Sequence, residues 1–93
     1  MKIIYKETFV VRLEKQLKYI SENSPKSAKK LKTEFIQRIK TNPDNPYLFR
    51  KSIYFENDSV RDLIHKGYTI VFRINENQIE IFGLTRFQEN PTN

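Results

Sequence analysis

The chain has 93 residues, the length of one domain, and its 17 Lys and Arg against 11 Asp and Glu give a net charge of +6. It contains no cysteine, which excludes disulfides and cysteine metal sites and fits a reducing cytoplasm. No apolar run reaches the ~18 residues of a membrane-spanning helix, and the first residues are too short and too mixed for a signal peptide. We therefore expect a cytoplasmic protein that is neither secreted nor embedded in a membrane.

The charge is unevenly distributed along the chain. Residues 1–51 hold 13 basic residues against 5 acidic ones, whereas residues 52–93 hold 4 against 6. A basic surface attracts polyanions and acidic proteins through its summed field. A solvated, lysine-rich helix face explains the same charge, and composition alone does not separate the two interpretations.

The first half predicts one short strand and two helices. Ile3–Tyr5 is a β-type run, and after it Phe9, Leu13, Leu17 and Ile20 recur at helical spacing. Ser24 suits a helix N-cap and Pro25 the first helical position. A second apolar stripe follows and ends before Pro43; its members are Ala28, Leu31, Phe35 and Ile39. These patterns predict an antiparallel helical hairpin over about residues 7–42.

The second half predicts a loop and then strands. Residues 43–58 are rich in Pro, Asn and Asp and indicate a long loop that could contain one short strand. Strands are expected over about residues 59–86, with Lys66-Gly67 forming a two-residue type I′ turn. Tyr68 to Ile74 alternate strictly, which places every second side chain in the core. Residues 87–93 form a short polar tail.

These elements predict one α+β domain over residues 1–93, with the order β-α-α-β-β-β. The helical hairpin should cover one face of a small, mainly antiparallel sheet. The other face is expected to be exposed or partly exposed and is a place where a functional site could lie.

Few kinds of chemistry fit this sequence. With only Gly67 and Gly83, a glycine-rich phosphate loop is excluded, and no dinucleotide motif is present. His65 is the single histidine, so we expect no metal site and no cofactor. What remains is a set of basic residues in and before the strands: Arg50, Lys51, Arg61, His65, Lys66, Arg73 and Arg86.

Four of these basic residues suggest a metal-independent ribonuclease site. Arg61 and Arg86 could bind phosphate with their planar guanidinium groups if their strands are neighbours. His65 or Lys66 could supply the acid or the base. Alternatively, each is an ordinary surface charge or forms an ion pair, as is usual for such residues.

The strand region resembles the C-terminal half of RelE/ParE toxins. The matching segments are Val60–Leu63 (VRDL), Gly67–Ile74 (GYTIVFRI) and Gln78–Pro91 (QIEIFGLTRFQENP). The length and the element order match as well, so the resemblance covers nearly the whole chain. It implies the toxin of a type II toxin–antitoxin system, with roles in growth inhibition and plasmid stabilisation.

The resemblance also implies site residues. Arg61 and Arg86 match the arginines of the family's second and fourth strands. Arg50 and Lys51 lie near the catalytic lysines of RelE-like members, and together with Tyr68 we assign them to target or nucleic-acid binding. An acidic antitoxin is implied as the partner in a hetero-oligomer, and we expect its acidic side chains to pair with Lys26, Lys29, Lys30 and Lys32.

The sequence is compatible with three functions. ParE-like members inhibit DNA gyrase, whereas RelE-like members cleave mRNA in the ribosomal A site. Many RNA-cleaving members carry Tyr or His directly after the last strand, where this chain has Phe87 and Gln88. Because phenylalanine cannot transfer a proton, this departure favours gyrase inhibition or a weakened nuclease. The third function is a non-toxic basic domain that binds only its partner.

Overall fold

The computed structural model describes residues 2–41, 45–86 and 91. Its elements in chain order are β1 (Lys2–Tyr5), α1 (Glu7–Ser21), α2 (Pro25–Thr41), the 3-10 helix η1 (Pro46–Leu48), β2 (Arg50–Lys51), β3 (Val60–His65), β4 (Tyr68–Asn75) and β5 (Gln78–Arg86). The predicted α+β order is confirmed, with η1 and β2 added within the predicted loop. None of the helices in these residues is long and apolar enough to span a membrane.

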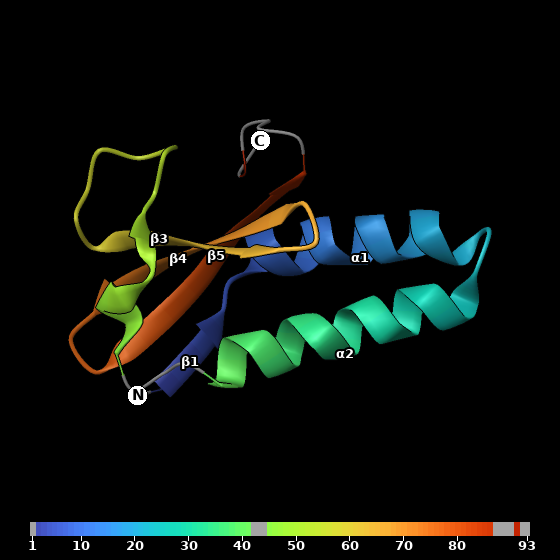
Figure 1. Ribbon diagram of the computed structural model, residues 1–93, viewed down its shortest axis with the longest axis horizontal. Helices are drawn as coiled ribbons and strands as arrows, with labels where there is room; N and C mark the ends of the chain where they lie inside the picture. Colours follow the sequence, from blue (N-terminus) through green and yellow to red (C-terminus); the bar gives the residue numbers. More distant parts are fainter. Residues whose placement is uncertain (1, 42–44, 87–90, 92–93) are drawn as a thin grey trace.

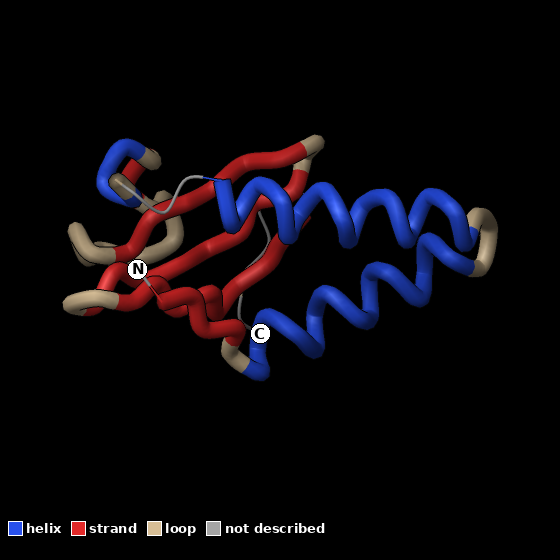
Figure 2. Tube along the Cα trace, turned by 90° about the horizontal axis from the view of Figure 1, so that it is seen from below, coloured by secondary structure: helices blue, strands red, loops and turns tan. Residues whose placement is uncertain are grey.

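The two helices form the predicted hairpin. Ser24 caps α2, since its hydroxyl accepts a hydrogen bond from the Ser27 amide at 3.2 Å. The buried residues of the helices follow the predicted stripes: Phe9 and Leu13 in α1, and Ala28, Leu31, Phe35 and Ile39 in α2. α1 and α2 run side by side, and their connecting turn projects beyond the sheet (Figures 1 and 2).

The five strands form one sheet in the order β1-β5-β4-β3-β2. β1 pairs with β5 in parallel, and the other three pairings are antiparallel. Lys66 and Gly67 connect β3 to β4 with φ angles of 50° and 83°. Both values lie in the left-handed region, as a type I′ turn requires.

The core lies between the helical hairpin and one face of the sheet. Tyr68, Ile70, Phe72 and Ile74 of β4 are all buried there, as the alternation predicts. Ile79, Ile81 and Leu84 of β5 and Leu63 of β3 complete this face. Phe9 and Phe35 meet it from the helices and are almost fully buried.

The opposite face of the sheet is more covered than expected from the sequence. Its central residues are buried: Val60, Asp62, Thr69, Val71 and Thr85. Two segments cover them. The ring of Phe55 packs on that of Phe82 at 5.4 Å, and the Pro91 carbonyl accepts a hydrogen bond from the Leu84 amide at 3.2 Å. The expectation of an open second face is therefore wrong for its centre.

The close packing of Pro91 on β5 requires a glycine at position 83. A Cβ atom at Gly83 would lie 3.2 Å from the Cβ atom of Pro91 and 3.1 Å from that of Val71. The missing side chain lets Pro91 approach the strand closely, and Pro91 is itself fully buried.

Candidate functional site

The strand order and register separate Arg61 and Arg86, which could converge only if their strands were neighbours. β4 lies between β3 and β5, so their strands are not neighbours. Arg61 lies opposite Phe72, whereas Arg86 lies opposite Tyr68, which in turn faces His65. The two arginines are thus roughly 13 Å apart along the strands and about 10 Å apart across them. The predicted residues fall into two clusters at opposite ends of β3.

The first group, which we call the hairpin-end cluster, consists of Glu34, His65, Lys66, Tyr68 and Arg86. Glu34 extends from α2 to the β3–β4 turn. Its carboxylate lies 3.2 Å from His65 Nε2 and 2.9 Å from Lys66 Nζ. The turn that the sequence predicted is therefore tied to α2 by two polar contacts.

Aromatic contacts complete the hairpin-end cluster. The Phe35 ring meets the rings of His65 and Tyr68 edge to face, at 5.6 Å and 5.3 Å. The Arg86 guanidinium lies 5.1 Å from the centre of the Tyr68 ring. The Tyr68 hydroxyl donates a hydrogen bond to Gln16 Oε1 at 3.3 Å and lies 3.5 Å from Arg86 Nη1.

Electrostatics hold Glu34 in its charged form. The hydrogen bond from Lys66, and after it the contact with His65, lowers the pKa of the Glu34 carboxyl from its ordinary value. Glu34 was not among the site residues predicted from the sequence. A signal for it exists, because Glu34 is the single acid in the otherwise basic α2.

The second group, which we call the edge-strand cluster, consists of Arg50, Lys51, Asp58, Arg61 and Asp62. Arg50 Nη2 lies 3.2 Å from the Asp62 carboxylate, and Lys51 Nζ lies 3.0 Å from that of Asp58. The Asp62 side chain is fully buried, and its Oδ2 atom also accepts a hydrogen bond from the Ile53 amide. These contacts hold the loop between β2 and β3, which contains Ile53 and Phe55, against the sheet.

Arg61 binds backbone carbonyls. Its Nε donates to the Asp58 carbonyl at 2.9 Å, and its Nη1 lies 3.3 Å and 3.1 Å from the carbonyls of Tyr47 and Phe49. Its guanidinium also lies 5.0 Å from the centre of the Tyr47 ring. Arg61 therefore joins η1, the residue that follows it and the loop before β3.

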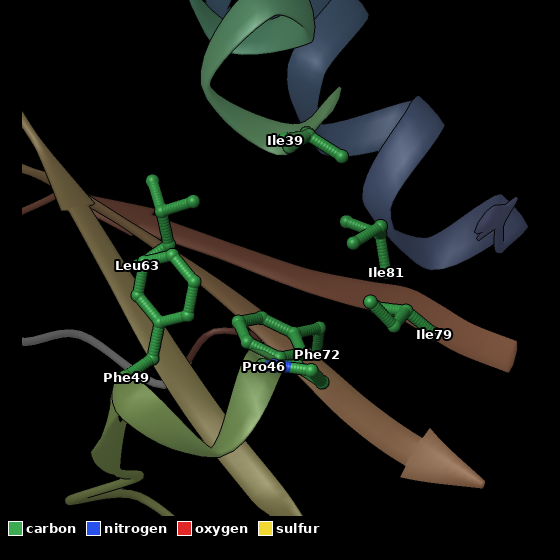
Figure 3. Close-up of a pocket in the computed structure, with 7 residues that line it drawn as sticks. All are labelled: Ile39, Pro46, Phe49, Leu63, Phe72, Ile79 and Ile81. Carbon is green, nitrogen blue, oxygen red and sulfur yellow. The ribbon is translucent and has the colours of Figure 1, made fainter. Parts of the chain in front are cut away.

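An apolar pocket lies beneath η1. Pro46 and Phe49 close it from the outside, and α2 contributes Ile39 (Figure 3). The sheet contributes its remaining lining residues: Leu63, Phe72, Ile79 and Ile81. Since the Phe49 ring packs edge to face on Phe72 at 5.5 Å, η1 is anchored to the core through this pocket.

The lysines predicted to meet an antitoxin lie on the exposed surface of α2. Lys26, Lys29 and Lys30 line a shallow depression along the helix, and Lys32 is exposed beside them. In the part of the chain that the structure describes, none of the four forms an ion pair. Phe87 and Gln88 lie outside the described residues.

Metal-ligating side chains do not gather in the described ranges. Residues 2–41, 45–86 and 91 contain no group of three His, Asp or Glu side chains arranged to hold an ion.

Comparison with known families identifies the chain. Residues 3–90 match the sequence model of the family described as the ParE toxin of the parDE type II toxin–antitoxin system. No curated protein matches the chain at a significant level. Because the family match covers nearly the whole sequence and the fold has the expected order of elements, the chain belongs to the family of ParE toxins of type II toxin–antitoxin systems.

Proposed function

We propose that this toxin inhibits growth by poisoning DNA gyrase and that a cognate acidic antitoxin neutralises it. One observation carries the choice of gyrase over RNA cleavage: the side chains best suited to proton transfer are turned into the protein. Tyr68 is 4% exposed, and the His65 side chain is 13% exposed. A general acid or base must reach the substrate within hydrogen-bonding distance.

The separation of the arginines supports the same choice. Stabilising the crowded phosphate of RNA cleavage needs several cations at one place. Arg61 and Arg86 lie at opposite ends of the sheet, and Arg61 is bound to three carbonyl groups. Arg61 is thus built into the fold as a connector between segments.

The second candidate function is ribosome-dependent, metal-independent mRNA cleavage. One observation favours it: Tyr68, His65, Lys66 and Arg86 come together in the hairpin-end cluster. Lys66 has a side chain that is 57% exposed, so a phosphate could approach it. On this alternative the ribosome must open the cluster to expose Tyr68 and His65.

The antitoxin proposal rests on the charge of α2. This helix has six basic residues and one acidic residue, and its predicted lysine contacts are exposed. An acidic segment lying along it would gain attraction from several lysines at once. Its apolar side chains would need a separate surface, because the exposed side of α2 is polar.

Induction in growing cells separates the two candidate functions. A gyrase poison should cause DNA-damage signalling and filamentous cells while translation continues. A ribosome-dependent nuclease should stop translation and leave mRNA cuts at the A site. A-site cuts without DNA damage would remove the gyrase proposal.

A further inference from the structure

Two apolar side chains on η1 point away from the protein. Leu48 is 81% exposed and Tyr47 is 51% exposed. Their neighbours Pro46 and Phe49 face inward and line the apolar pocket (Figure 3). Burial of this inner pair leaves Tyr47 and Leu48 on the outer side of a single short turn. We name these two residues the η1 knob.

The η1 knob is held rigidly for a surface loop. Arg61 binds the carbonyls of Tyr47 and Phe49, on either side of Leu48, and its guanidinium lies over the Tyr47 ring. The Phe49 amide also donates to the Pro46 carbonyl at 3.2 Å, closing the turn. A turn whose backbone is already fixed loses less conformational entropy on binding than a mobile loop, which favours affinity.

The chemistry of the knob fits a pocket on a folded protein. Exposed Tyr and Leu beside an arginine offer the apolar and aromatic area that dominates protein interfaces. Arg50 is paired with Asp62 and Lys51 with Asp58, whereas Arg61 contacts carbonyl groups and keeps its positive charge beside the knob. In the edge-strand cluster two carboxylates therefore offset two of the three cations, and the feature that distinguishes this surface is the 81% exposed Leu48 side chain, which suits an apolar pocket on a protein.

The position of the knob separates it from the lysines at the start of α2, although Arg38 and Lys40 in the last turn of that helix lie on the side of η1. η1 lies at one end of the molecule, and the tip of the helical hairpin lies at the other (Figures 1 and 2). The long axis of the molecule is 39 Å. The lysine-bearing start of α2 and the apolar knob at the other end suit two different partners: an acidic antitoxin segment and the protein target.

We propose that the η1 knob docks into an apolar pocket of the toxin's protein target and that Arg61 is the positioning residue that presents it. The identity of the target as gyrase rests on the proposed function, whereas the role of the knob does not. Arg61 acts through the backbone of η1, so its contribution should depend on Leu48.

The test compares Leu48→Asp with Val11→Asp. Both replace an exposed apolar residue by the same acid, and Val11 is 54% exposed on α1, away from η1. We expect Leu48→Asp to weaken growth inhibition and gyrase inhibition about tenfold or more, as for an interface anchor. Val11→Asp should retain both, and both variants should keep the wild-type circular dichroism spectrum.

A photo-crosslinking amino acid gives a direct readout of contact. Placed at position 48, it should form a covalent adduct with a gyrase subunit, whereas at position 11 it should form none. Equal toxicity of Leu48→Asp and wild type, or equal crosslinking at both positions, would overturn the proposed knob.

The role of Arg61 is tested by a double-mutant cycle. Arg61→Lys keeps the charge but cannot reproduce the fork of hydrogen bonds to three carbonyls. Because Arg61 acts through Leu48, the single variant Arg61→Lys should weaken inhibition. The same substitution should cause little further loss when Leu48→Asp is already present. Losses that multiply would show that Arg61 acts independently of the knob.

Failure of the two proposals can be told apart. If the wild type stops growth without affecting gyrase, the proposed target is wrong, and the growth data for Leu48→Asp still judge the knob. If gyrase is inhibited equally by wild type and Leu48→Asp, the target stands and the knob is wrong. A wild type that affects neither growth nor gyrase contradicts both.

Discussion

The guanidinium of Arg86 lies over the ring of Tyr68, whereas that of Arg61 lies over the ring of Tyr47. The two contacts have the same chemistry but lie at opposite ends of the sheet. The sequence predicts the residue types and the face on which each one lies. It does not fix which residues stand opposite each other, because that depends on strand order and register.

The separation of the two arginines predicts independent effects. We expect Arg61→Ala and Arg86→Ala each to lower toxicity while the protein stays folded. The two sites are well over 10 Å apart, so the loss in the double variant should equal the product of the single losses. Survival after induction measures all three variants, with expression checked in parallel.

A shared catalytic site predicts a different result. Residues that act as one unit are strongly non-additive, and the double variant would then be no worse than the poorer single variant. That outcome would revive a ribonuclease site containing both arginines.

Glu34 predicts a dependence of stability on pH. Its pKa in the folded state is lowered by Lys66 and His65, so the unfolded state binds more protons as the carboxyl titrates. The stabilisation is complete above the pKa of the unfolded carboxyl and is lost as pH falls through the lowered pKa of the folded state. The folded protein therefore loses stability as the pH falls into the acid range.

The test compares the Tm of wild type and Glu34→Gln from neutral pH down to a pH below the pKa of the Glu34 carboxyl. The gap between the two should be largest near neutral pH and should close in acid. Glu14→Gln is the control, because Glu14 is exposed and forms no ion pair in the described ranges. A gap that stays constant with pH would show that the Glu34 charge does not stabilise the fold.

At the scale of elements, the long periodic segments were predictable. Both helices and the β3–β4 hairpin follow from apolar spacing, a Ser-Pro start and a Lys-Gly turn. The sequence pattern does not predict the positions of η1 and β2, because these elements have only three and two residues and depend on tertiary contacts. Arg61 and Phe49 supply those contacts, and neither gives a local signal in the sequence.

The β3–β4 turn gives a prediction of its own. Gly67 has a φ of 83°, and a Cβ atom added there would meet no other atom within 4 Å, so its only constraint is backbone conformation. Gly67→Ala should lower the free energy of unfolding by about 1–2 kcal/mol, because L-residues are strained there. Gly67→Asn should lose less, since Asn tolerates this region better.

Urea denaturation measures both variants. The midpoint should fall more for Ala than for Asn, with unchanged slope. Equal midpoints for wild type and Gly67→Ala would contradict the assigned turn.

At the scale of the whole molecule, the covered second face was the least predictable feature. Segments distant in the sequence meet there: the loop after β2 packs on β5 through Phe55, and Pro91 returns to Gly83. Neither the loop that contains Phe55 nor the polar C-terminal segment carries an apolar periodicity that would indicate burial. Among the described residues, the centre of this face is therefore buried, whereas Arg73 and Ile64 on the same face stay exposed.

The uneven charge predicts how the antitoxin binds. If an acidic segment lies along α2, reversing the charge of Lys26 and Lys30 to Glu should weaken antitoxin binding by tenfold or more and reduce its sensitivity to salt. Reversing Lys15 and Lys18 on α1 is the matched control, because it changes the net charge equally. Anisotropy with a labelled antitoxin, repeated at several salt concentrations, measures both effects. Binding that is unchanged by the α2 reversal would exclude this surface.

Gyrase as the target of this ParE-family toxin can be tested with purified components. The chain is incubated with gyrase, ATP and supercoiled plasmid, and trapped complexes are then released with detergent and protease. Gyrase poisoning predicts linear plasmid that accumulates with the chain and gyrase together, is absent with the chain alone and disappears when the antitoxin is added. Unaltered gyrase activity, with cuts appearing in ribosome-bound mRNA on addition of the same preparation, would contradict it.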